Sequence, residues 1–229
     1  MQVIILADGD VGPRTALDDA WPGWRSSGAI VIAADGGARH AGPLGLRIDR
    51  WVGDGDSIDE ADLAALAAAG VPIERARSDK DESDTELAIL AGLRLAPTAI
   101  TILGALGGPR LDHALANLGL LAMPELRQLD VRLLAATARV RYLQAPAVDD
   151  APVSMSLAGP VGGGVSLLPV GTDAHGVTTS GLAYALEDEP LRVGRTRGLS
   201  NVRTDGTRAA VVLRAGRLLV VETPATLST

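Results

Sequence analysis

The chain contains one lysine, Lys80, which stands between Asp79 and Asp81 in a run of acidic and hydroxyl residues from 78 to 86. Apart from three histidines, every other basic residue is an arginine. Because the chain uses arginine elsewhere, we infer that this position needs the compact, flexible ammonium group of lysine. A second acidic cluster, Asp54-Gly55-Asp56, lies earlier in the chain.

Carboxylates that gather in one place repel one another unless a cation lies among them. At about 4 Å and an effective dielectric constant near 20, each like-charged pair costs roughly 4 kcal/mol before screening. A hard cation such as Mg²⁺ carrying a polyphosphate would relieve this repulsion. The two acidic clusters therefore predict a site for phosphoryl chemistry.

The first part of the chain alternates between short apolar runs and longer amphipathic segments. The apolar runs predict strands over residues 3–7, 29–34, 50–52, 73–75, 99–103 and 131–135, and the amphipathic segments predict helices over 60–69, 85–95 and 111–122. This alternation predicts an open, mostly parallel α/β domain. In such sheets ligands bind at the carboxyl ends of the strands. Asp54 and Asp56 directly follow one predicted strand, and Asp35 and Gly36 follow another.

Part of each acidic cluster has an ordinary structural explanation. Each contains a residue pair with the spacing of a helix capping box, Ser57/Glu60 and Ser83/Glu86. Asp84 would also be favoured near the positive end of a helix. Capping does not account for two aspartates with a glycine between them, nor for Lys80.

A glycine-rich loop with Gly107 and Gly108 follows the predicted strand 99–103 and leads into a helix. Such a loop presents free N–H groups to phosphate. Arg110, His113 and Asn117 fall on one face of this helix, opposite an apolar stripe formed by Leu111, Leu115 and Leu118. The polar face is either the solvated side of the helix or, as its position beside the loop favours, a surface that contacts a ligand.

The chain changes character near residue 145. The rest consists of short β-rich runs divided by turn residues, which predicts a small antiparallel β-sandwich. We therefore expect two domains, residues 1–145 and 146–229.

Composition excludes several classes of protein. The net charge of −7 argues against nucleic acid as a partner. The absence of cysteine excludes disulfides and thiolate metal sites. No apolar run approaches the length of a membrane span. The amino terminus lacks the features of a signal peptide, so the expected location is the cytoplasm. The sequence contains neither a Walker A loop nor a dinucleotide-binding glycine motif.

The motifs of the first part resemble, in their order, those of the thiamine pyrophosphokinase family. They are Asp35-Gly36-Gly37-Ala38, Gly53-Asp54-x-Asp56-Ser57, Lys80-Asp81-x-Ser83-Asp84-x-Glu86 and Gly107-Gly108-x-Arg110-x-Asp112-His113-x-x-x-Asn117. Downstream, three more segments look like the thiamine-binding domain of that family. They are Ser166-Leu167-Leu168-Pro169, Thr178-Thr179-x-Gly181-Leu182-x-Tyr184-x-Leu186 and Gly198-Leu199-Ser200-Asn201.

The resemblance implies Mg²⁺-dependent transfer of pyrophosphate from ATP to the thiamine hydroxyl, with release of AMP. It also implies a homodimer whose active sites lie between subunits. Carried onto this sequence, it assigns catalysis to Asp54, Asp56, Lys80, Asp81 and Asp84, of which the four aspartates would hold the metal. It assigns ATP and phosphate binding to Asp35, Gly36, Gly107, Gly108, Arg110, Asp112, His113 and Asn117, and thiamine binding to Thr179, Ser200 and Asn201.

Two positions depart from the family pattern. Gly55 stands where the family usually has an aromatic residue, and Pro109 is inserted between the glycine pair and Arg110. Neither change removes a charged group.

Two other functions stay open from the sequence alone. One is a related pyrophosphokinase that acts on another alcohol, such as a hydroxymethyl pterin. The other is a non-catalytic sensor of nucleotides or thiamine phosphates.

Overall fold

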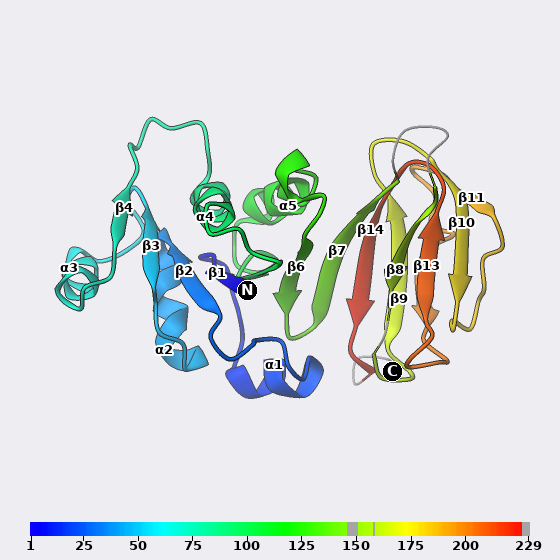
Figure 1. Ribbon diagram of the computed structural model, residues 1–229, viewed down its shortest axis with the longest axis horizontal. Helices are drawn as coiled ribbons and strands as arrows, with labels where there is room; N and C mark the ends of the chain where they lie inside the picture. The colour runs from blue at the N-terminus through cyan, green and yellow to red at the C-terminus, as the bar shows by residue number, and fades with distance from the viewer. Residues whose placement is uncertain (146–150, 158, 226–229) are drawn as a thin grey trace. The chain divides into compact units, whose positions relative to one another are not determined.

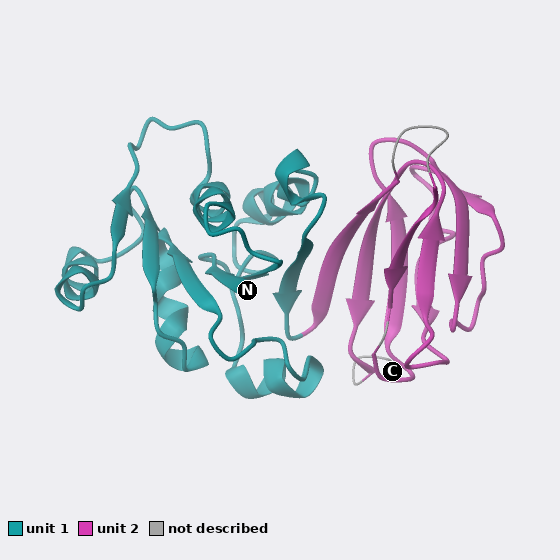
Figure 2. Ribbon diagram, in the orientation of Figure 1, with its two compact units in different colours: residues 1–136 teal, residues 137–229 magenta. Residues whose placement is uncertain are grey.

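The structure is a computed structural model that describes residues 1–145, 151–157 and 159–225 (Figure 1). The chain divides into two compact units, residues 1–136 and 137–229 (Figure 2). The division precedes a strand, β7 (Ala138–Gln144), that the sequence analysis did not predict. This strand pairs along its length with β14 (Arg217–Thr223) of the second unit, so it belongs there and not with the first domain. Pro146 and Ala147, where the second domain was expected to begin, lie outside the described residues.

The first unit is built on a parallel sheet with the strand order β6-β5-β1-β2-β3-β4. Its strands are β1 (Gln2–Leu6), β2 (Ile30–Ala34), β3 (Arg50–Gly53), β4 (Ile73–Arg75), β5 (Ala99–Leu103) and β6 (Asp130–Ala135). Each predicted strand lies within one residue of an observed one. The apolar runs predict these strands well because a parallel sheet buries both faces.

The helices of the first unit connect these strands. They are α1 (Arg14–Ala20), α2 (Ala41–Leu44), α3 (Glu60–Ala68), α4 (Asp84–Leu93) and α5 (Leu111–Leu120), with 3₁₀ helices η1 (Asp35–His40) and η2 (Pro124–Leu126). Ser83 caps α4 as expected, because its hydroxyl accepts a hydrogen bond from the Glu86 N–H at 3.2 Å. The expected cap at Ser57 is wrong. Helix α3 begins after Asp59, and the Ser57 hydroxyl instead donates to Asp56 at 2.8 Å.

The core of the first unit holds the site-bearing strands in place. Ile4, Leu6 and Trp51 are fully buried together, and α4 packs on β1, β2 and β3. The Trp51 indole donates a hydrogen bond to the backbone oxygen of Asp35 at 3.1 Å. A buried side chain of β3 thereby fixes the backbone at the end of β2.

The second unit consists of two antiparallel sheets, β12-β9-β14-β7 and β11-β10-β13-β8. Its other strands are β8 (Val153–Ser156), β9 (Gly164–Pro169), β10 (Ala174–Ser180), β11 (Glu189–Leu191), β12 (Asn201–Val202) and β13 (Ala210–Leu213). Apolar residues of both sheets share one buried cluster, which includes Val165, Val177 and Val220. The expected fold class, an open α/β domain followed by a small antiparallel β-sandwich, is confirmed.

Candidate active site

Three adjacent strands of the first unit are followed by aspartates. Asp8 comes shortly after β1, Asp35 directly after β2, and Asp54 directly after β3. Because these strands are parallel neighbours, their carboxyl ends meet at one edge of the sheet. The fold therefore gathers acidic side chains where an open α/β sheet binds its ligands.

Asp35, Asp54 and Asp84 form a compact group of carboxylates. Each contributes an oxygen, and these oxygens all lie within 4.8 Å of one another. Asp84 is the first residue of α4, so the group joins two strand ends to the amino terminus of a helix. Three carboxylates at this spacing repel one another strongly unless a positive charge lies among them.

Lys80 supplies a positive charge to this group. Its ammonium nitrogen lies 2.6 Å from Asp54 Oδ2 and 3.0 Å from Asp84 Oδ1, and its side chain is only 12% exposed. Burial acts to lower the pKa of Lys80, but its bonds to the two carboxylates prevail and the pKa is raised. The hydrogen bond from Lys80 lowers the pKa of Asp54 despite partial burial. Lys80 therefore stays charged and helps to hold the cluster together.

Asp35 is the buried member of the group, at 1% exposure. Its backbone has a φ of 44°, a left-handed conformation that few side chains other than Asn and Asp adopt readily. One carboxylate oxygen accepts the Gly55 N–H at 3.1 Å, and the other has no hydrogen-bond partner among the described residues. Burial raises the pKa of Asp35 to about 6.

The carboxylate group is suited to a divalent cation. Its donors are all oxygens, which Mg²⁺ and Ca²⁺ prefer, and the buried Asp35 carboxylate has one oxygen without a hydrogen-bond partner among the described residues. A cation there would favour the ionised form of Asp35 and satisfy that oxygen.

Asp56 and Asp81 lie outside the carboxylate group. Both are exposed, and Asp56 accepts the hydrogen bond from Ser57. Of the four aspartates proposed as metal ligands from the sequence, the structure brings Asp54 and Asp84 together. Asp35, which the sequence analysis assigned to nucleotide binding, joins them.

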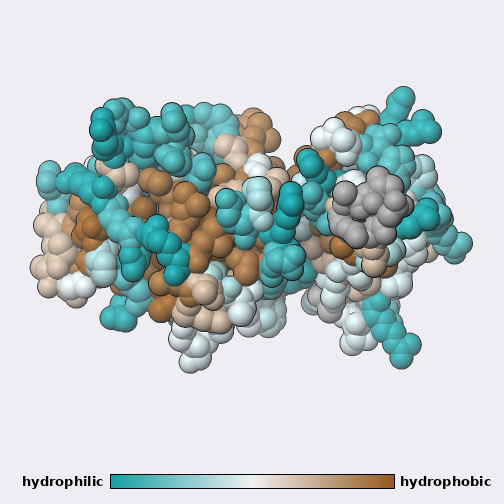
Figure 3. All heavy atoms as spheres, turned by 45° about the horizontal axis from the view of Figure 1, so that its top comes forward, coloured by the Kyte–Doolittle hydropathy of each residue, from teal (hydrophilic) through white to brown (hydrophobic). Residues whose placement is uncertain are grey.

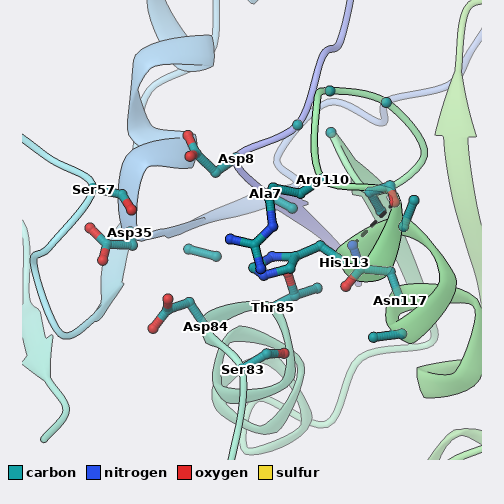
Figure 4. Close-up of a pocket in the computed structure, with 18 of the residues that line it drawn as sticks. Ala7, Asp8, Asp35, Ser57, Ser83, Asp84, Thr85, Arg110, His113 and Asn117 are labelled. Atoms are coloured by element: carbon teal, nitrogen blue, oxygen red, sulfur yellow. Dashed lines mark hydrogen bonds between the residues drawn. The ribbon is translucent and has the colours of Figure 1, made fainter. Parts of the chain in front are cut away.

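A pocket of about 630 Å³ opens beside the carboxylate group (Figure 4). One side of the pocket is acidic and is lined by Asp8, Asp35 and Asp84, with Lys80 beside them. Arg110 lines it from the loop that precedes α5. The pocket also touches His113, Asn117, Gly107 and Gly108. A pocket of this size with acidic and basic walls suits a ligand that carries both phosphates and a metal ion.

Two glycines allow the loops around the pocket to pack closely. A Cβ on Gly9 would lie 2.2 Å from the Gly107 oxygen, and one on Gly104 would lie 2.2 Å from the Ala7 oxygen. Gly104 also has a φ of 71°. The loops after β1 and β5 therefore touch through their backbones, which leaves Gly107 and Gly108 at the pocket wall. Gly36 is buried and lies near Asp8.

Helix α5 turns its polar side toward the pocket. Asn117 is buried and donates a hydrogen bond to the Ala105 oxygen at 3.1 Å, so it fixes the loop after β5. Arg110 is exposed and forms a two-bond ion pair with Asp112 at 3.0 and 2.7 Å. This pair lowers the pKa of Asp112 to about 2. Asp112 does not line the pocket, so it acts as a partner that orients Arg110.

The apolar side of α5 is exposed instead of packing into the core. Leu111 is 70% exposed and Leu115 is 60% exposed. Figure 3 shows apolar residues gathered on one face of the first unit, bordered by hydrophilic residues. Leu111 and Leu115 therefore leave apolar side-chain surface of α5 open to solvent.

Asp8 and Arg39 are among the pocket-lining residues that were not assigned to the site from the sequence. Arg39 of η1 forms an ion pair with Asp8 and also bonds to its backbone oxygen. The signal for Asp8 was present, because Asp8-Gly9 repeats the pattern of a strand followed by Asp-Gly that drew attention to Asp35 and Asp54. Arg39 carried no comparable signal.

In the second unit, Asn201 fastens one loop to another. Its side chain accepts the Tyr184 N–H at 3.0 Å and donates to the Tyr184 oxygen at 2.6 Å, while the Tyr184 side chain is exposed. Ser200 lies beside it with a φ of 59°. Thr179 is buried, and its hydroxyl accepts the Leu186 N–H at 2.9 Å. The Thr179 hydroxyl is thus already used to hold the chain at Leu186 in place.

Comparison with known proteins identifies both parts of the chain. Residues 24–133 match the family model of the thiamin pyrophosphokinase catalytic domain, and residues 157–218 match that of the thiamin pyrophosphokinase vitamin B1 binding domain. The thiamine pyrophosphokinase of Bacillus subtilis is 26% identical over 190 residues, which cover 83% of this chain and 85% of that protein. Thiamine pyrophosphokinase 2 of Arabidopsis thaliana is 30% identical over 195 residues, covering 76% of this chain and 70% of that protein.

Solved structures share the fold. The crystal structure of the Bacillus subtilis thiamine pyrophosphokinase has a TM-score of 0.81 at 23% identity and covers 98% of this chain and 99% of that chain. Yeast thiamin pyrophosphokinase has a TM-score of 0.69 at 14% identity, covering 98% and 86%. The fold and the matched domains define a kinase with an α/β domain and a β-sandwich domain. The chain belongs to the thiamine pyrophosphokinase family, as the motif resemblance predicted. Within the described ranges, no helix is long and apolar enough to cross a membrane.

Proposed function

We propose that the chain transfers pyrophosphate from ATP to the hydroxyl of thiamine in the presence of Mg²⁺, giving thiamine diphosphate and AMP. The observation that carries this proposal is the carboxylate group of Asp35, Asp54 and Asp84 with Lys80 among them, beside a pocket lined by a glycine loop and Arg110. Family membership supports the choice of reaction and of acceptor.

The carboxylate group would hold Mg²⁺. A bound Mg²⁺ would neutralise charge on the phosphates and help to fix their position. Asp56 and Asp81 keep their proposed role as further ligands, on the ground that each lies close in sequence to a member of the group. Lys80 and Arg110 would offset the negative charge that develops as the phosphate bond breaks.

The transfer needs positioning more than covalent chemistry from the protein. The thiamine hydroxyl oxygen forms a bond to the β-phosphorus of ATP, and the bond from that phosphorus to the oxygen retained by AMP breaks. The hydroxyl proton is released. The N–H groups of Gly107 and Gly108 would hold the phosphates in line for this exchange, with Arg110 and His113 at the same wall. Asn117 and Asp112 would act indirectly, by fixing the loop and orienting Arg110.

The second unit would bind thiamine through the segment of Ser200, Asn201 and Tyr184. An exposed tyrosine suits an aromatic cation such as thiamine better than a bare polar surface would. Asn201 would act by holding the Tyr184 backbone, since its amide bonds to that backbone on both sides. Thr179 would support the same region from the interior.

Replacing Asn201 with alanine should raise the Michaelis constant for thiamine while that for ATP barely changes. The variant loses the clamp on Tyr184, which affects the binding of one substrate only. Steady-state kinetics with each substrate varied in turn measures both constants. A general loss of stability, with no difference between the two substrates, would show that Asn201 is only a turn residue.

We also propose a homodimer whose active sites lie between subunits. The exposed Leu111 and Leu115 supply apolar surface that a second copy would cover. At a thiamine concentration well below the raised Michaelis constant of Asn201→Ala, a mixture of Asn201→Ala and Asp84→Asn chains should then be more active than either variant alone, because one site of each mixed dimer would have both halves intact. Activity no greater than that of the parent variants, with mixed dimers shown to form, would exclude shared sites.

The proposed reaction is tested by measuring AMP formation from ATP and Mg²⁺ with thiamine and, in parallel, with a hydroxymethyl pterin. With thiamine, we expect AMP and thiamine diphosphate to form at the same rate. With the pterin, AMP formation should stay at background. AMP formation with the pterin alone would reassign the acceptor. No AMP with either alcohol would favour a non-catalytic sensor.

A further inference from the structure

The second unit contains a buried ion network centred on Glu222. This residue is fully buried in β14, and three arginines bond to its carboxylate. Arg139 and Arg141 of β7 approach it at 2.7 and 2.8 Å, and Arg203 approaches at 2.9 Å. Burial acts to raise the pKa of Glu222, but the arginines outweigh it and the pKa is lowered. The carboxylate is therefore ionised at neutral pH.

Arg203 differs from the other two arginines of the network. It is 1% exposed, whereas the side chains of Arg139 and Arg141 are 17% and 13% exposed. Its guanidinium also donates to the Pro160 oxygen at 3.2 Å, and its Nε has no hydrogen-bond partner among the described residues. Burying a charge of this kind is costly, and a buried ion network is often no more stabilising than apolar residues of similar volume in place of all its members.

A glycine makes room for the Arg203 guanidinium. A Cβ on Gly163 would lie 2.2 Å from Arg203 Nη1, so any larger residue at this position would displace the group. Gly163 lies in the glycine run 162–164, which the sequence alone presents as an ordinary loop. The same run holds the Arg203 backbone, because the Arg203 N–H donates to the Gly163 oxygen at 2.8 Å and the Arg203 oxygen accepts the Gly162 N–H at 2.9 Å.

Arg203 lies where the two segments that carry Asn201 and Tyr184 meet. It follows Asn201 by two residues, and its backbone forms a bridge with Leu182, which precedes Tyr184 by two residues. The two segments are also joined directly, because the Asn201 amide bonds to the Tyr184 backbone. The residue that carries the buried guanidinium thus links both segments through its backbone.

We propose that Arg203 is a positioning residue for thiamine, which acts through Asn201 and Tyr184 and is itself held by Glu222 and Gly163. The inference rests on the proposed function, in which this segment binds thiamine. A charged anchor fits such a role because its hydrogen bonds fix direction as well as distance. An apolar residue of similar size would fill the space without fixing the strand.

The test compares Arg203→Met with a matched change in the same network, Arg141→Met. Either variant leaves Glu222 with two arginine partners, so both should fold with similarly lowered melting temperatures. Only Arg203→Met should raise the Michaelis constant for thiamine, by about tenfold or more, with the constant for ATP within about twofold of the wild type. Arg203→Lys, which restores a charge, should recover part of the loss. Equal thiamine constants in the two methionine variants would overturn the proposal.

Gly163→Ala provides a second variant that keeps every charge of the network. The added methyl group would force the guanidinium away from its place, so the thiamine constant should rise as in Arg203→Met. If Arg203→Met does not fold, this variant decides the question, and an unchanged thiamine constant overturns the proposal. Failure of the proposed function is seen separately, because the wild-type protein would then form no thiamine diphosphate.

Discussion

Replacing Asp84 with asparagine should lower turnover by at least about 10²-fold while the protein stays folded. The change removes a charge from the carboxylate group but keeps the shape of the side chain. Electrostatic stabilisation of the transition state at such sites is worth roughly 3 kcal/mol or more. The melting temperature without metal should hold or rise, because repulsion within the group is relieved and Lys80 keeps its bond to Asp54.

A matched control for this prediction is Asp79→Asn in the same segment. Asp79 is exposed and pairs with Arg77, so its loss should leave turnover nearly unchanged. Near-normal turnover in Asp84→Asn would show that Asp84 does not belong to the proposed site.

Asp56→Asn adds a further comparison. A loss as large as that of Asp84→Asn would support Asp56 as a metal ligand, and a small loss would confine the site to the carboxylate group of Asp35, Asp54 and Asp84.

Replacing Lys80 with methionine should have opposite effects on turnover and on metal binding. Turnover should fall by about 10²-fold or more, because a charge that offsets the developing negative charge is lost. Binding of Mn²⁺ in the absence of ATP should become tighter, because the Lys80 ammonium pairs with Asp54 and Asp84 and so competes with a cation for these carboxylates. Titration of free Mn²⁺ by electron paramagnetic resonance measures the affinity without reference to activity.

Arg77→Met serves as the control for Lys80→Met. Arg77 lies three residues away, is exposed, and pairs with Asp79 instead of the carboxylate group. It should leave both turnover and Mn²⁺ affinity close to those of the wild type. Weaker Mn²⁺ binding in Lys80→Met than in the wild type would show that Lys80 supports the cation site and does not compete for it.

The strands of the first unit could be predicted from the sequence because burial on both faces leaves nearly continuous apolar runs. β7 could not. Its residues do alternate, but Arg139 and Arg141 occupy positions on a largely buried face where apolar side chains would mark a strand, because they pair with Glu222, which is far away in sequence. The same network gives Arg203 a role that no local pattern indicates.

The acidic clusters of the site could be recognised from the sequence, but the grouping of the carboxylates could not. Asp35 joins Asp54 and Asp84 from a left-handed backbone whose oxygen accepts a hydrogen bond from the Trp51 indole, and neither property is visible in an Asp-Gly motif. Asp8 was missed although it repeats that motif. The exposure of Leu111 and Leu115 was also not predictable, because an apolar stripe on a helix usually faces the core.

The most direct test of the proposed reaction uses ATP that carries a radioactive β-phosphorus, with Mg²⁺ and thiamine. Transfer of pyrophosphate predicts that all of the label consumed appears in thiamine diphosphate, with one unlabelled AMP for each. It also predicts that Asp84→Asn loses this product in proportion to its loss of turnover. Label retained in ADP, with thiamine monophosphate as the other product, would contradict the account, because the γ-phosphate alone would then have moved.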